Sequence, residues 1–329
     1  MTARRPRVAV LLLTYGEPPR ARFRDQYDYS LLILKRLTLK VAPIPRFLLP
    51  WIAFKRARGR VSGWREAAYS SPLEAITTRQ VEALRQALAG RDPSRDYDVR
   101  AVYEFRRPLL PEVLASLAPD RFDATLLMPM YLADSDFTTG ISRGDLLDYQ
   151  KRFGAPPSPS PRYVCSFSDD NRMDELMERF VLSQLENHAW NEQRCRESAL
   201  LLGVHGTLVN APAGIDTGLG TTRCFYQRLH DRLASRFAYT SVGWLNHTLG
   251  GEWTSPDLTT AVAETERRGI CSVVYYPFGF LADNAESQLE GRLVFQQHPA
   301  LSVLHLPCMN DWPPFIDYLA GRVEESLAS

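Results

Sequence analysis

The chain has 329 residues, of which 45% are hydrophobic and 23% are charged, a composition typical of a globular enzyme with two domains of ordinary size. Its net charge of +1 gives no general case for nucleic-acid binding, and the absence of an apolar run of eighteen residues argues against a transmembrane helix. The charge is uneven, because residues 1–66 hold 15 Lys and Arg against 4 Asp and Glu. This basic segment predicts an anionic partner close to it.

The five cysteines are spaced too widely for a CxxC or another compact metal motif. We therefore expect reduced thiols, as in a cytoplasmic protein, and no cysteine-based metal cluster. The apolar run at 8–13 is short and no small-residue cleavage site follows it. It predicts a first strand and not a signal peptide.

In chain order, the first half alternates apolar runs typical of buried strands with segments of helical periodicity. We expect strands at 8–14, 99–103 and 124–130 and helices at 22–40, 74–89 and 111–117.

Residues 42–60 need two interpretations. The segment holds the aromatic residues Phe47, Trp51 and Phe54. It also holds five basic residues, namely Arg46, Lys55, Arg56, Arg58 and Arg60. The segment is either a helix that packs into the core and has a solvated basic end, or a cationic, amphipathic lip. Such a lip would cover an apolar ligand or contact a membrane, where each basic side chain contributes about 1 kcal/mol near an anionic leaflet.

The Pro-rich stretch at 155–161 predicts a linker between a domain at 1–158 and a second at 159–329, whose last helix can pack back on the first domain. The second half repeats the alternation. We expect strands at 163–167, 199–204, 241–245, 271–276 and 303–306 and helices at 173–188, 217–237, 256–268, 283–294 and 314–327. This pattern predicts two α/β domains, each a parallel sheet flanked by helices, with the active-site cleft between them. No G-x-G-x-x-G follows the first strand, and neither a P-loop nor a G-x-S-x-G motif is present.

His205 directly follows the apolar run at 199–204, so we expect it at the carboxyl end of a buried strand, where α/β proteins bind ligands. Glu286 and Glu290 follow the next apolar strand and lie four residues apart, which places them on one face of a helix. Asp283 fits the N-cap of that helix. A histidine that faces two acids is suited to proton transfer and transient metal binding, although a packed histidine and dipole-complementing acids are the simpler interpretation.

Seven segments, in the right order, resemble the ferrochelatase family, whose members insert ferrous iron into a porphyrin. The longest are LLLTYGEP at the first strand, the SPL block with a later Thr and Gln, PMY through TTG, and PFGFLADNAE. The matching segments are 11–18, 64–80, 129–140, 205–206, 253–256, 277–286 and 306–311. The resemblance implies two Rossmann-like domains of the chelatase type.

The resemblance also implies roles. His205 matches the catalytic histidine, Glu286 its partner acid, and Glu290 the next acid of a metal or proton path, so these three are the expected metal contacts. Tyr15 matches a catalytic position close to the metal. The porphyrin contacts implied are Tyr15, Ser71, Tyr131, Thr138, Thr139 and Trp253.

Two features point to different porphyrins. Tyr15 resembles the coproporphyrin-using branch of the family, whereas the insert at 42–60 resembles the lip of the protoporphyrin branch. We expect Tyr15 on one face of the macrocycle and His205 on the other. Iron enters as substrate, no cofactor is required, and Cys308 alone cannot hold an iron–sulfur cluster. The expected location is the cytoplasm, with peripheral contact to the inner face of the membrane through 42–60.

Three positions depart from the family pattern. Glu104 stands where the family usually has arginine, Asn284 replaces a histidine or cysteine, and Val294 replaces a third acid. These departures favour the alternative, a non-catalytic porphyrin- or haem-binding homologue that acts as a carrier or regulator. His205 together with both acids favours the active enzyme, because a carrier has no need of the acids.

Overall fold

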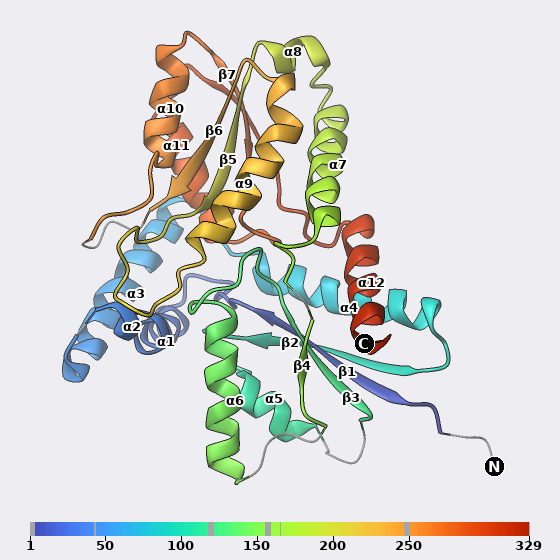
Figure 1. Cartoon of the computed structure of the whole chain (residues 1–329). Helices are drawn as coiled ribbons and strands as arrows, with labels where there is room; N and C mark the ends of the chain where they lie inside the picture. Colours follow the sequence, from blue (N-terminus) through green and yellow to red (C-terminus); the bar gives the residue numbers. More distant parts are fainter. Residues whose placement is uncertain are drawn as a thin grey trace. The chain divides into compact units, whose positions relative to one another are not determined.

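The computed structural model describes residues 4–42, 44–117, 122–154, 159–164, 166–246 and 251–328. The chain divides into two compact units, one made of residues 1–166 with 310–329 and the other of residues 167–309. Each unit is built on a parallel four-stranded sheet with helices on both faces, as the alternating apolar runs predict (Figure 1).

The sheet of the first unit has the strand order β2-β1-β3-β4. Its members are β1 (Arg7–Thr14), β2 (Asp96–Tyr103), β3 (Ala124–Pro129) and the short β4 (Arg162–Tyr163). Every residue of β1 after Arg7 is buried, because this central strand is covered on both faces. The carboxyl ends of β1, β2 and β3 carry Tyr15, Glu104 and Tyr131 respectively, since the backbone pairs Glu104 with Thr14 and Met130 with Leu13.

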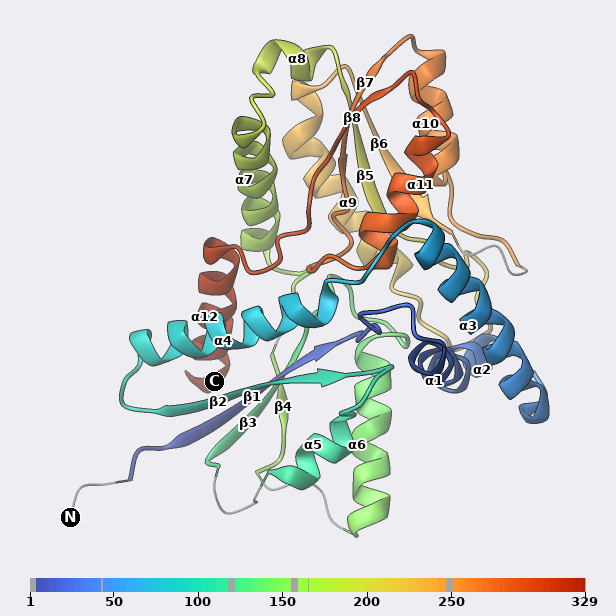
Figure 2. The same ribbon diagram turned by 180° about the vertical axis from the view of Figure 1, so that it is seen from behind.

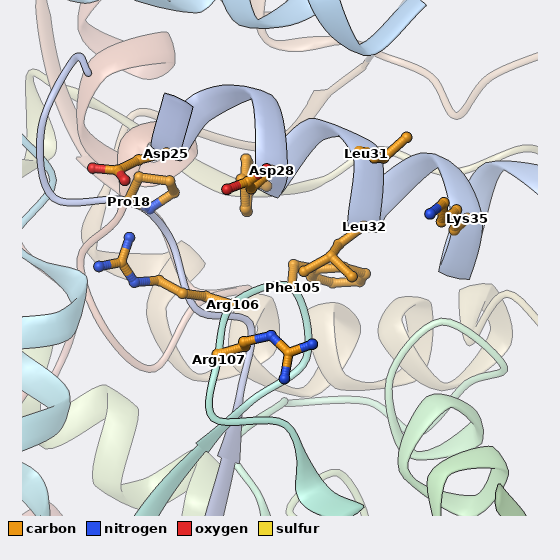
Figure 3. A pocket seen from close by; sticks show the side chains of 10 residues that line it. Pro18, Asp25, Asp28, Leu31, Leu32, Lys35, Phe105, Arg106 and Arg107 are labelled. Carbon is orange, nitrogen blue, oxygen red and sulfur yellow. The ribbon is translucent and has the colours of Figure 1, made fainter. Parts of the chain in front are cut away.

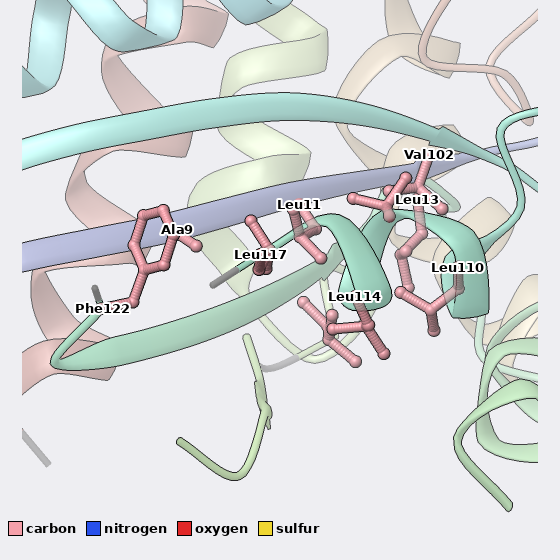
Figure 4. Close-up of a cluster of buried hydrophobic side chains, with 10 residues drawn as sticks. Ala9, Leu11, Leu13, Val102, Leu110, Leu114, Leu117 and Phe122 are labelled. Atoms are coloured by element: carbon pink, nitrogen blue, oxygen red, sulfur yellow. The ribbon is translucent and has the colours of Figure 1, made fainter. Parts of the chain in front are cut away.

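The core on one face of this sheet is made by alternate residues of β1, which share that face because side chains on a strand alternate. Ala9, Leu11 and Leu13 pack against Leu110 and Leu114 of α5 (Leu110–Ser116), as Figure 4 shows. Helix α6 (Thr139–Phe153) adds Leu146 and Tyr149 to the same cluster. The opposite face is covered by α4 (Leu73–Arg91) and α12 (Pro313–Ala328), as Figure 1 shows.

The predicted helix at 22–40 is one helical segment with a wider turn inside it: α1 (Phe23–Ile33), a π-helical turn η1 (Leu34–Thr38) and α2 (Leu39–Val41). The segment at 42–60 is helical from η2 (Arg46–Leu48) into α3 (Leu49–Glu66), which lies beside α1 (Figure 2).

Helix α3 combines parts of both interpretations of 42–60. Its inner face buries Ala53, Ala57, Val61 and Trp64, as a core-packing helix would. Phe47, Trp51 and Phe54 are nevertheless exposed, at 79%, 57% and 47%. Arg60 holds the helix to the turn after β1, because its guanidinium donates to Glu17 Oε1 at 2.7 Å and to Gln26 Oε1 at 2.8 Å.

The sheet of the second unit has the order β6-β5-β7-β8, which repeats the topology of the first. Its strands are β5 (Ala199–His205), β6 (Tyr239–Leu245), β7 (Ser272–Tyr276) and β8 (Ser302–His305). One face packs on α10 (Leu258–Arg267) and α11 (Gly291–Gln296), which follows a π-helical turn η5 (Ala285–Glu290). The remaining helices of this unit are α7 (Asn171–Asn187), α8 (Glu192–Arg196), α9 (Leu219–Leu233) and η4 (Ala234–Arg236).

One expectation about the connection between the halves needs correction. The strand expected at 163–167 in the second half is β4, and it belongs to the first sheet, because Leu126 and Leu127 of β3 pair with Arg162 and Tyr163. The predicted boundary at 158, like most of the predicted linker, lies outside the described residues, and the division falls after residue 166.

The second domain also ends before 329, because residues 310–328 belong to the first unit. Helix α12 packs on α4 there, with Phe315 and Leu319 fully buried. Gln80 Nε2 donates to the Asn310 carbonyl at 2.8 Å, and Arg79 pairs with Asp311 at 2.8 Å. No helix in the described part of the chain has both the length and the apolar character needed to cross a membrane.

Candidate active site

His205 is the last residue of β5 and lies at the carboxyl end of the strand, as predicted. The backbone of β5 fixes its place, since His205 pairs with Leu245 of β6 and the next amide, that of Gly206, donates to the Leu245 carbonyl at 2.8 Å. The imidazole side chain is 50% exposed, whereas the six strand residues before it are all buried. A rigid, buried strand therefore presents an accessible imidazole.

Glu286 reaches the imidazole from the π-helical turn η5. Glu286 Oε1 lies 2.6 Å from His205 Nδ1, although the two residues are 81 positions apart in the chain. The glutamate side chain is only 17% exposed, so one partner of the pair is sheltered and the other faces solvent. The prediction that these two residues meet is confirmed by the geometry.

The start of η5 differs from the prediction. Asn284, not Asp283, is the N-cap, and its Oδ1 accepts from the amides of Glu286 at 2.8 Å and Ser287 at 3.0 Å. Asp283 Oδ1 instead accepts from the Cys308 amide and from Gln288 Nε2, which ties the turn to the strand-end segment after β8. Both residues are good caps, so the sequence does not separate them. Asn284, an apparent departure from the family pattern, thus orients Glu286.

The electrostatics of the pair favour proton binding by the imidazole. Burial alone would lower the pKa of His205, but the Glu286 carboxylate, with a smaller contribution from Glu290, raises it above the usual 6.5. When Nδ1–H is donated to the carboxylate, Nε2 carries the lone pair of the neutral ring. This arrangement can accept a proton at Nε2 and share the resulting positive charge with Glu286.

Glu290 ends the π-helical turn and follows Glu286 by four residues. It contributes to the pKa of His205. No group of three or more His, Cys, Asp and Glu side chains in the described ranges converges as ligands of a resident metal would. The three predicted metal contacts therefore divide into a hydrogen-bonded pair and a nearby acid.

Tyr15 directly follows β1 and lies among aromatic rings. Its ring centroid is 4.5 Å from that of Phe105 and 6.1 Å from that of Tyr29, and both contacts are edge-on. Burial and nearby charge, that of Tyr15 among them, raise the pKa of Tyr29 well above 10.

Tyr131 and Glu104 form a second pair at this sheet edge. The Tyr131 hydroxyl donates to Glu104 Oε2 at 2.6 Å, and the glutamate is only 2% exposed. Burial raises the pKa of Glu104 to about 8, against the opposing effects of Tyr131 and Arg36. Arg36 is itself paired with Asp145 at 2.6 Å. The acid that replaces the family's arginine is therefore largely neutral at pH 7.

The other predicted porphyrin contacts lie in loops or at the starts of helices. Ser71 is buried, and its Oγ accepts from the Leu73 amide at 3.3 Å at the start of α4. Thr138 is the N-cap residue of α6, and its Oγ1 donates to the Ala133 carbonyl at 3.2 Å, while Thr139 is buried in the first turn. Trp253, in the second unit, forms an isolated bridge with Leu208.

A pocket of about 450 Å³ lies in the first unit between α1 and the loop after β2 (Figure 3). Phe105 and Leu32 meet on its apolar side, while Arg106 and Arg107 extend from the loop. Arg106 pairs with Glu74 and Arg107 with Glu112, so both charges are balanced. Neither arginine was among the predicted site residues. The adjacent charges at 106–107, three residues beyond the end of a predicted strand, are the signal that could have found them.

The comparisons with known proteins agree with this geometry. The model of the family described as Ferrochelatase matches residues 7–327 of the chain. A ferrochelatase of Neisseria meningitidis serogroup B is 27% identical over 340 residues, covering 98% of this chain and 95% of that protein. A ferrochelatase of Synechococcus elongatus is 24% identical over 328 residues, covering 98% and 83% respectively.

Two solved structures share the fold at low sequence identity. One is CbiX, the terminal enzyme for biosynthesis of siroheme in denitrifying bacteria, with a TM-score of 0.52, 15% identity and coverage of 97% of this chain and 98% of that one. The other is SirB from Bacillus subtilis with Fe3+, with a TM-score of 0.52, 11% identity and coverage of 97% and 95%. They support the two-unit α/β architecture of the chelatases.

Proposed function

Because the chain belongs to the ferrochelatase family, it is an enzyme of haem biosynthesis that inserts iron into a porphyrin, and we propose that His205 and Glu286 carry out the proton transfer of that reaction. The observation that carries the proposal is the 2.6 Å contact between His205 Nδ1 and Glu286 Oε1 at a strand end.

The chemistry requires a base. A free-base porphyrin loses two pyrrole N–H protons as Fe²⁺ enters, and the metal cannot bind all four nitrogens until both have left. Neutral His205 accepts the first proton at Nε2, and the Glu286 carboxylate stabilises the imidazolium that forms. The half-exposed ring then passes this proton to water and accepts the second. The raised pKa of His205 makes the neutral ring a stronger base.

Iron is a substrate that binds transiently before it enters the porphyrin, so the side chains that contact it have to be accessible. We propose that Glu286 and Glu290 guide the ion, because carboxylate oxygens and imidazole suit Fe²⁺ and the two acids stand on one turn. We further propose that the reaction requires no resident cofactor and no iron–sulfur cluster.

For the macrocycle, we propose contacts by Tyr15, Ser71, Tyr131, Thr138, Thr139 and Trp253. Tyr15 and Tyr131 offer aromatic surface at the end of the first sheet, and the buried Phe105 ring packs edge-on against Tyr15. Binding energy from such a surface can supply the strain that bends the flat ring, roughly 1–5 kcal/mol. Basic side chains of residues 1–66 would hold the propionates.

The test is an anaerobic assay of Fe²⁺ or Zn²⁺ insertion, followed by absorbance, with protoporphyrin and coproporphyrin in separate reactions. His205→Ala should lose insertion and keep porphyrin binding, measured by fluorescence. His188→Ala is the matched control, because His188 is an exposed histidine of the same unit at the end of α7. Insertion by His205→Ala at the wild-type rate would contradict the proposal. Porphyrin binding without insertion by the wild-type protein would favour the carrier or regulator.

We also propose that the exposed aromatic patch of Phe23, Phe47, Trp51 and Phe54 touches the surface of an anionic membrane from the cytoplasmic side. Within this set, the Phe23 and Phe54 ring centroids lie 5.2 Å apart, and Lys55 lies over the Trp51 ring at 3.9 Å. Aromatic rings at a polar boundary with flanking cations are typical of interfacial helices.

Sedimentation with vesicles tests this contact. Wild-type protein should bind vesicles that contain anionic lipid, and Trp51→Ser together with Phe47→Ser should weaken binding. Leu147→Ser is the control, because Leu147 is 58% exposed on α6, away from the patch in the sequence. Equal vesicle binding by all three proteins would rule the patch out.

A further inference from the structure

Tyr275 lies on the same face of the second sheet as His205. Its ring packs in the cluster that holds Ala199 and Leu201 of β5, and Gly203 and His205 continue that alternation along the strand. The ring is fully buried and meets the rings of Phe295 and His305 edge-on, with centroids 5.3 Å and 4.7 Å away. Tyr275 thus belongs to the layer between the sheet and η5.

Two glycines make room for the end of this side chain. A Cβ added to Gly203 would clash with the Tyr275 hydroxyl oxygen, and one added to Gly291 would lie 3.2 Å from the same oxygen. Gly203 stands two residues before His205, and Gly291 directly follows Glu290. The hydroxyl therefore lies where the histidine strand meets the turn that carries both acids.

The hydroxyl is a polar group within a layer of mainly hydrophobic side chains. Among the described residues it has no hydrogen-bond partner, although it is fully buried. An unpaired buried hydroxyl costs free energy that a phenylalanine of the same shape would not. Burial, and after it the charges of Glu286, Cys308 and Glu290, raise the pKa of Tyr275 well above 10, so the phenol is a donor throughout the working pH range.

We infer that Tyr275 is a positioning residue for metal insertion, whose hydroxyl donates one hydrogen bond, directly or through one water molecule, to the carboxylate of either Glu286 or Glu290 as the metal passes. The inference rests on the proposed function of His205 and Glu286. A donor behind the acids fixes the direction in which their oxygens point, as groups behind metal ligands commonly do. Tyr275 itself touches neither the metal nor the porphyrin.

Tyr275→Phe removes only the hydroxyl, and the chain offers a matched control in Tyr276→Phe. Tyr276 is the next residue, is also fully buried and also has an unpartnered hydroxyl among the described residues. It points to the opposite face of the sheet, where its ring centroid lies 5.9 Å from that of Phe180. Neither Glu286 nor Glu290 contributes to its pKa, which burial raises most.

The measurement is steady-state Zn²⁺ insertion, with the KM for metal and the KM for porphyrin determined separately, and the melting temperature of each protein. Tyr275→Phe should lower kcat/KM for Zn²⁺ about tenfold. Its KM for porphyrin should stay unchanged and its melting temperature should stay equal or rise. Tyr276→Phe should match the wild type in both kinetic constants.

Wild-type kinetics for Tyr275→Phe would overturn the inference, as would equal losses in the two variants. The proposed function is judged by His205→Ala in the same assay. If His205→Ala is inactive while Tyr275→Phe behaves as wild type, only the inference on Tyr275 fails. If His205→Ala inserts Zn²⁺ normally, the proposed function fails first.

Discussion

The sheets of the two units have the same topology, but they carry different kinds of side chain at their carboxyl ends. In each sheet, the strand that comes first in the sequence of the unit is second in the strand order. The orders β2-β1-β3-β4 and β6-β5-β7-β8 therefore correspond strand by strand. The first sheet ends in Tyr15, Tyr131 and a glutamate that is 2% exposed. The second ends in a half-exposed histidine paired with an acid. One fold thus supplies two kinds of edge, and the difference lies in a few strand-end residues.

Exposure and charge explain what each edge can do. Glu104 is enclosed, and burial keeps it in its neutral form, so the first edge presents phenols and little free charge. Glu286 lies beside an imidazole whose pKa it raises, so the second edge holds a pair suited to binding a proton. We therefore propose that the second edge carries out the proton and metal chemistry and that the first edge contacts the apolar ring.

The largest effect is expected from Glu286→Gln. The amide keeps the shape but removes the charge that stabilises the imidazolium, so the insertion rate should fall about 100-fold with porphyrin binding intact. Stopped-flow absorbance of Zn²⁺ insertion measures it. Glu192→Gln, an exposed acid of α8 in the same unit, is the control. A rate within twofold of wild type would show that the pair at the second edge is not needed.

A smaller effect, on stability, is expected at the first edge. Glu104 has a pKa raised from 4.5 to about 8, so between these values the native state holds a proton that the unfolded chain releases. Stability from this group is therefore present below pH 4.5 and is lost as the pH rises through 8, by up to a few kcal/mol. Glu104→Gln should flatten this dependence and exceed the wild type at pH 9 in chemical denaturation. Parallel curves for the two proteins would contradict the buried neutral acid.

The smallest effect is expected from Tyr15→Phe, which keeps the ring contacts with Phe105 and Tyr29. If the hydroxyl assists the metal, insertion should slow several-fold, roughly the effect of one hydrogen bond, while the porphyrin Kd is unchanged. Fluorescence titration and single-turnover absorbance separate the two quantities. An unchanged rate would limit the first edge to binding the ring.

The sequence sufficed to predict the strands because they are short apolar runs that end at turn residues. Strand β5 and His205 at its carboxyl end follow from the run at 199–204 alone. Strand β4 was assigned to the wrong sheet, because two residues that pair with β3 carry no signal of their partner. The last helix was expected to be able to pack back on the first domain, and α12 does pack on α4 there.

The site divides in the same way. His205 and Glu286 could be predicted as a pair because each follows a buried strand, and strand ends in one sheet meet at one edge. The sequence did not predict the π-helical geometry of η5 or the N-cap by Asn284, because neither feature has a distinct local sequence pattern. The neutral state of Glu104 and the place of Tyr275 depend on burial, which arises only when distant segments pack.

The most direct test of the central claim is the pH dependence of single-turnover Zn²⁺ insertion at saturating porphyrin, in the wild type and in His205→Ala. The pKa of His205 is raised above 6.5. At pH values below this pKa, His205 is protonated and cannot act as a base. The wild-type rate should rise with pH through this pKa and then level off. In His205→Ala the step should vanish and the rate should be low throughout. A His205→Ala variant that keeps both the step and the wild-type plateau would contradict the account.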